Sequence, residues 1–72
     1  MTRIQLNAFD KDSPASYSKT IQVKDVTQLN VESEKFDNEV PFSRFYRESE
    51  ILDGENDEIE KALAKLDTWS TL

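Results

Sequence analysis

The chain has 72 residues, of which 33% are charged, and its net charge is −6 at pH 7. This length supports one small domain spanning residues 1–72. Because the sequence contains no His and no Cys, it excludes a Ser-His-Asp triad, a cysteine nucleophile, a disulfide and a cysteine-ligated zinc site. Its single glycine, Gly54, also excludes the glycine-rich phosphate-binding loops.

Two segments near the N-terminus, residues 2–9 and 17–24, alternate apolar and polar side chains, a pattern typical of half-buried strands. The apolar faces are formed by Ile4, Leu6 and Ala8 in the first segment and by Tyr17, Ile21 and Val23 in the second. The polar residues 10–16, with Pro14 among them, predict a loop between the strands. We therefore expect these strands to pair antiparallel.

Residues 25–40 contain three spaced apolar side chains and fit two structures, one turn of helix or a short third strand. The three side chains are Val26, Leu29 and Val31. The pattern slightly favours an edge strand at residues 29–31, with residues 35–39 as a polar connector. A third strand or a covering helix has physical support, because a two-stranded hairpin alone is only marginally stable in water.

Residues 41–52 show helical spacing, with Tyr46 beside the apolar stripe and Pro41 suited to the first turn. The stripe consists of Phe42, Phe45, Ser49 and Leu52. Residues 53–56 interrupt this pattern. The sequence therefore predicts a helix that ends before Asp53.

The strongest helical pattern covers residues 57–69, where Asn56 suits the N-cap position. Its apolar stripe consists of Ile59, Ala62, Leu63, Leu66 and Trp69. The acidic side chains of its first turn complement the positive end of the helix dipole. A helix is therefore predicted over the whole of this segment.

Together these elements predict an α+β fold. An N-terminal β-hairpin or three-stranded antiparallel sheet, within residues 2–31, packs against one or two C-terminal helices within residues 41–69. We expect the sheet to contact Leu63, Leu66 and Phe45. Its inner face would consist of Ile4, Leu6, Ile21 and Val23.

The net negative charge arises entirely from the second half of the chain, since residues 1–36 hold equal numbers of acidic and basic side chains. Seven carboxylates, which we call the acidic block, fall within residues 48–60, where no Lys or Arg occurs. The acidic block consists of Glu48, Glu50, Asp53, Glu55, Asp57, Glu58 and Glu60. Two interpretations are open: a solvated face that keeps the protein soluble, or a surface that binds a basic partner. A helical block would present charge at a spacing comparable to that of nucleic-acid phosphates.

Tyr46 is the best candidate for an exposed aromatic contact beside the acidic block, whereas Phe42, Phe45 and Trp69 are expected to pack in the core. The surrounding negative charge argues against direct nucleic-acid binding. The sequence around Gly54 partly matches a calcium-binding EF-hand loop, but Ile51 occupies a ligand position and cannot bind a cation. We expect no metal ion, no cofactor and no catalytic residues, because so small a core rarely encloses a reaction pocket.

In size and charge, the chain resembles small acidic proteins of phages and mobile elements that act on host nucleic-acid machinery, including anti-CRISPR and anti-restriction DNA mimics. The resemblance implies a non-enzymatic inhibitor or decoy that occupies a basic site on a nucleic-acid-processing protein. The expected partner-binding residues are Tyr46 and the acidic block. The alternative is a small structural or regulatory subunit that docks through an apolar or aromatic helix face.

No apolar run is long enough for a secretory signal or a membrane span, so a cytoplasmic location without membrane contact is expected. A homo-oligomer is compatible with the sequence, because one core of this size contributes only about 3–5 kcal/mol.

Overall fold

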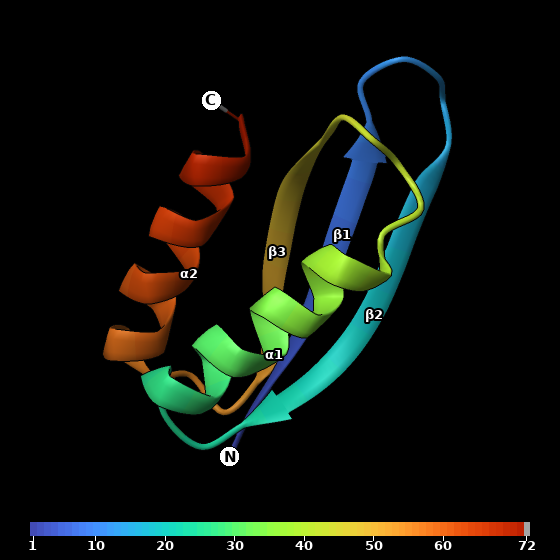
Figure 1. Cartoon of the computed structure of the whole chain (residues 1–72). Coiled ribbons are helices and arrows are strands. Elements are labelled where there is room, and N and C mark those ends of the chain that lie inside the picture. Colours follow the sequence, from blue (N-terminus) through green and yellow to red (C-terminus); the bar gives the residue numbers. More distant parts are fainter. Residues whose placement is uncertain (72) are drawn as a thin grey trace.

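The computed structural model describes the backbone of residues 1–71 and the side chains of residues 1–68. It is an α+β domain, as predicted, with a three-stranded antiparallel sheet and two helices. In chain order the elements are β1 (Thr2–Asp10), β2 (Ser16–Val23), α1 (Val26–Glu39), β3 (Phe45–Asp53) and α2 (Asp57–Thr71) (Figure 1).

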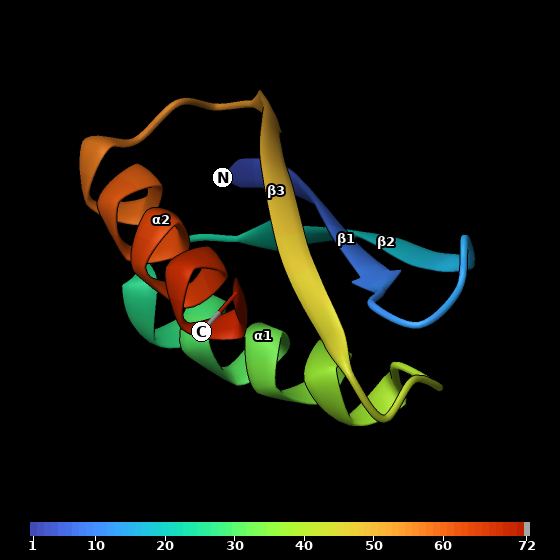
Figure 2. The same ribbon diagram turned by 90° about the horizontal axis from the view of Figure 1, so that it is seen from above.

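The sheet has the order β2-β1-β3, with β1 in the centre and antiparallel to both neighbours. It follows that β2 and β3 run parallel to each other, and α1 makes the crossover between them. Both helices lie on the same face of the sheet, and no element of the described backbone, residues 1–71, covers the opposite face (Figure 2). Side chains on that opposite face are therefore available for contact with another molecule.

The predicted strands and loop at the N-terminus are confirmed. Alternate side chains of β1 form the centre of the core, and Ile4, Leu6 and Ala8 are each 0% exposed. Asp10 closes the following loop by accepting hydrogen bonds from the backbone N–H of Asp12 and the hydroxyl of Ser13, and these bonds lower its pKa.

The edge strand predicted at residues 29–31 and the connector at 35–39 are wrong, because both segments belong to α1. Asp25 caps this helix by accepting a hydrogen bond from the backbone N–H of Gln28, and the Gln28 side chain in turn accepts from the backbone N–H of Lys24. The buried face consists of Leu29, Ser33 and Phe36. A polar Ser in the middle of this stripe hid its helical spacing.

The helix predicted at residues 41–52 is also wrong, because Pro41 follows the end of α1 and residues 45–53 form β3. In β3 the inward positions are Phe45, Arg47, Ser49 and Ile51. Two of these four are polar, so the alternation of a half-buried strand does not show in the hydrophobicity of the sequence. Phe42 and Phe45 pack partly buried against the core.

The turn from β3 to α2 depends on Gly54, whose φ of +73° lies in the left-handed region. Its carbonyl accepts a hydrogen bond from the hydroxyl of Thr2 at 2.6 Å. A Cβ at this position would overlap the carbonyl oxygen of Met1. This glycine is therefore required by the turn and by the close approach of β1.

The predicted C-terminal helix and its cap are confirmed in α2. The side-chain oxygen of Asn56 accepts hydrogen bonds from the backbone N–H groups of Glu58 and Ile59. Leu63 is buried, and Leu66 is partly buried against the same core. The core position predicted for Trp69 lies outside the described side chains.

Candidate functional site: an acidic interaction surface

The acidic block extends from the middle of β3 through the following turn into the first turn of α2. Three of its residues belong to β3, namely Glu48, Glu50 and Asp53, and Glu55 lies in the turn. The first turn of α2 contains the other three, Asp57, Glu58 and Glu60. All seven side chains are exposed. Because the block crosses three kinds of structure, it is not the single acidic helix whose charge spacing would imitate a nucleic-acid strand.

The block differs from most other carboxylates in having no partner among the described side chains. Within residues 1–68, none of its seven side chains forms an ion pair or accepts a hydrogen bond. Of the eight acidic residues outside the block, seven do. Ion pairs engage Asp12, Glu32, Asp37, Glu39 and Asp67, and the Asp10 and Asp25 side chains accept hydrogen bonds from a loop and a helix cap.

The pair Lys19–Glu39 illustrates how the carboxylates outside the block serve the fold. The Lys19 ammonium lies 3.0 Å from Glu39 and joins β2 to the end of α1, and the Tyr17 hydroxyl donates to the same carboxylate. The hydrogen bond from Lys19 lowers the pKa of Glu39, and Glu39 raises the pKa of Lys19. The Glu39 carboxylate is thus held by a cation and a hydroxyl, whereas the side chains of the acidic block are exposed to solvent.

Tyr46 lies on the uncovered face of the sheet, opposite Phe9 of β1. The two rings stack with their centroids 5.2 Å apart and their planes inclined by 27°. Both residues are half-buried, so part of the ring surface is accessible. This contact was not predicted, because the sequence places Phe9 only at the end of a strand and Tyr46 in an incorrect helix.

A groove of 410 Å³ between β3 and α2 gathers several of these acids. Glu50, Glu55 and Glu60 line it together with Asp67, and Ile51, Leu63 and Ala64 contribute its apolar wall. No Lys or Arg lines this groove. All the charged residues that line this groove are therefore negative.

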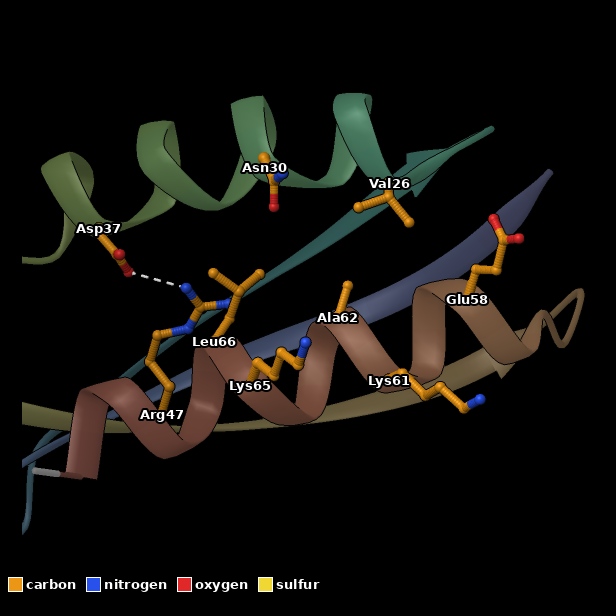
Figure 3. A pocket seen from close by; sticks show the side chains of 9 residues that line it. All are labelled: Val26, Asn30, Asp37, Arg47, Glu58, Lys61, Ala62, Lys65 and Leu66. Carbon is orange, nitrogen blue, oxygen red and sulfur yellow. Dashed lines mark hydrogen bonds and ion pairs between the residues drawn. The ribbon is translucent and has the colours of Figure 1, made fainter.

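A larger groove of 830 Å³ lies between α1 and α2 (Figure 3). Val26 and Asn30 point into it from α1, and Ala62 and Leu66 from α2. Charged residues of both signs line it: Arg47, Lys61 and Lys65 against Asp37 and Glu58. Because these charges nearly cancel, this groove favours neither an anion nor a cation.

Arg47 lies beneath this groove and is only 1% exposed. Its guanidinium pairs with Asp37 at 3.2 Å and lies 3.7 Å from Asp67, with a long hydrogen bond of 3.4 Å to Ser33. It also lies 5.6 Å from the centroid of the Phe36 ring. Burial raises the pKa of Asp37, with a smaller contribution from the nearby Asp67, while Arg47 opposes the shift without reversing it. Arg47 is thus a structural group that joins β3 to both helices.

Among residues whose positions the structure describes, no three His, Cys, Asp or Glu side chains are placed to hold a metal ion. No helix in the same part of the chain is both long and apolar enough to cross a membrane. No protein-family model, curated protein or solved structure matches the chain. The candidate site therefore rests on its own geometry.

Proposed function

We propose that this protein is a non-enzymatic, cytoplasmic protein-binding module, and that its acidic block and Tyr46 contact a basic surface of another protein. In this role it acts as an inhibitor or decoy that occupies the basic site of a nucleic-acid-processing protein. The observation that carries the proposal is the contrast between the two groups of carboxylates. Negative charges gathered on one surface repel one another, as Glu50, Glu55 and Glu60 do where they line the same groove, and a basic partner relieves that repulsion.

The positions of the aromatic residues argue against docking through an apolar helix face. The predicted helix over residues 41–52 does not exist, and its residues Phe42 and Phe45 contact the core. Tyr46 instead lies on the same strand face as Glu48 and Glu50. An aromatic residue beside unpaired charges suits a polar interface with one aromatic anchor.

The test begins with affinity capture from the source cell at low ionic strength, followed by elution with increasing salt. A partner that binds the acidic block elutes steeply with salt, whereas apolar docking is nearly independent of salt. The identified partner is then measured against the triple variant Glu55→Lys/Asp57→Lys/Glu58→Lys. All three side chains are exposed, so the fold is expected to survive.

This variant should bind at least about tenfold more weakly, because like charges across an interface cost several kcal/mol. A matched control, Asp12→Lys/Glu32→Lys/Glu34→Lys, changes the net charge by the same amount outside the block. Its two disrupted ion pairs are surface pairs of small energetic value. Unchanged binding by the folded block variant, or equal losses in both variants, would exclude the acidic block as the binding surface.

A further inference from the structure

The uncovered face of the sheet carries a short row of side chains that combines aromatic rings with carboxylates. We call it the aromatic–acidic strip, and it consists of Phe9, Tyr46, Glu48 and Glu50. The three residues of β3 alternate along the strand and share this face, since their register partners Phe9, Asn7 and Gln5 all lie on the outer side of β1. Both helices are on the other side of the sheet (Figure 2).

The polar neighbours of the strip bond to one another and leave its carboxylates without partners. The side-chain oxygen of Asn7, opposite Glu48, accepts hydrogen bonds from Gln5 at 3.1 Å and from Ser18 at 2.7 Å. Arg3 lies at the far end of this face, opposite Asp53, and forms no ion pair within the described side chains. The strip thus presents negative charge and an aromatic surface on a sheet whose neighbouring side chains are held in place.

We propose that the aromatic–acidic strip binds an arginine side chain of the partner protein, an inference that rests on the proposed function. A guanidinium plane stacks on the accessible surface of the Tyr46 ring, which Phe9 supports from the neighbouring strand. Glu48 follows on the same face about 6.6 Å along the strand, within reach of the guanidinium N–H groups.

Arginine suits this strip better than lysine does. Its planar group can stack on an aromatic ring and donate to a carboxylate at the same time, and it is more weakly hydrated than an ammonium group. A lysine would gain the attraction to Glu48 and Glu50 but less from the ring. The strip is therefore expected to prefer arginine over lysine, although the two side chains carry the same charge. A surface that acts through charge alone would not distinguish them.

The experiment compares a hexa-arginine peptide with a hexa-lysine peptide, each titrated calorimetrically into the full chain at low salt. The arginine peptide should bind about two- to fivefold more tightly, the factor expected for one exposed cation–π contact. Tyr46→Leu retains an apolar contact with Phe9 but removes the ring on which the guanidinium is proposed to stack, so the preference for the arginine peptide should be lost. Gln22→Ala, on the same face over β2, serves as the control and should keep the preference.

Chemical-shift mapping of the unmodified protein supplies a second measurement that needs no variant. The arginine peptide should shift the ring resonances of Tyr46 and the amides of β3 more than the lysine peptide does. Equal binding of both peptides, or a preference that survives Tyr46→Leu, would overturn the arginine assignment and leave the proposed function standing. Failure of both peptides to bind at low salt would overturn the proposed function and this inference together.

Discussion

At the level of single residues, Leu63 and Leu66 are neighbours on α2 that differ in how far they enter the core. Leu63 is 5% exposed, whereas Leu66 is partly buried and lines the groove between the helices. The sequence pattern treats them as equivalent members of one stripe. The structure separates them, because Leu66 lines the groove between α1 and α2 and is only partly buried, whereas Leu63 is buried.

Leu63→Ala should therefore destabilise the protein by about 2–5 kcal/mol, close to the whole stability expected for a core of this size. Leu66→Ala should cost roughly half as much, since less apolar surface is removed from contact. Urea unfolding followed by circular dichroism measures both. Val31→Ala, at a residue that is 48% exposed, is the control and should change stability by less than about 0.5 kcal/mol. Equal losses at both leucines would contradict the difference in burial.

At the level of secondary structure elements, Arg47 joins three of them from one buried position. It belongs to β3, its partners Ser33 and Asp37 belong to α1, and Asp67 belongs to α2. Asp67 also accepts a hydrogen bond from Ser49 at 2.8 Å. This network pairs the inward polar groups of β3 with both helices, although the Nε of Arg47 has no hydrogen-bond partner among the described residues and lies only within ion-pair distance of Asp67.

Arg47→Ala should destabilise the protein by about 2–4 kcal/mol, because it leaves a cavity and two carboxylates without their cation. This expected loss of stability is smaller than the largest losses found for buried ion pairs, because the Asp37 side chain is 43% exposed and solvent screens its charge. Arg47→Met fills the same space without the charge, so the difference between the variants isolates the cavity. Thermal unfolding of both variants beside the parent provides the measurement.

The loss caused by Arg47→Met should also depend on pH. Burial already raises the pKa of Asp37, and removal of the cation raises it further. A carboxyl with a raised folded-state pKa binds protons better in the folded state, so its cost disappears as the pH falls through that pKa. The deficit of the variant should therefore shrink between about pH 7 and pH 4. A deficit that stays constant over this range would show that charge at this site contributes nothing.

At the level of the whole molecule, the paired and the unpaired carboxylates of the described residues fall in different parts of the chain. All the ion pairs of the described side chains use acids outside the acidic block, while the block itself carries seven unpaired negative charges. Such a surface destabilises the isolated protein through repulsion and is relieved by counter-ions. Stability should therefore respond to the ionic strength.

The unfolding temperature of the parent should rise as NaCl increases from about 10 mM to about 200 mM, because screening weakens repulsion within the block. The variant Glu55→Lys/Asp57→Lys/Glu58→Lys should show little or no such rise. Low millimolar Mg²⁺ should stabilise the parent gradually, without an endpoint at one equivalent. Calorimetric titration that gave a sharp endpoint would instead indicate a specific cation site.

Local sequence signals determined β1, β2 and α2. Their apolar side chains recur with the period of their element, and caps or turn residues bound them, so each could be predicted without knowledge of its neighbours. The same holds for the exposure of the acidic block, since carboxylates without partners stay in solvent. One missed local signal is the Asp25–Gln28 pair, whose spacing of three is typical of a helix N-terminus.

Only the tertiary structure decided α1, β3 and the shape of the candidate surface. Ser33, Arg47 and Ser49 lie on inward faces yet are polar, so periodicity in hydrophobicity could not reveal them. They are tolerated because other elements bring polar partners to them: Arg47 contacts Asp37, Asp67 and Ser33, and Ser49 donates to Asp67. A buried polar group costs less once it is paired. The strand character of β3 then places Tyr46 against Phe9 and beside Glu48, a juxtaposition that depends on strand register and not on local sequence.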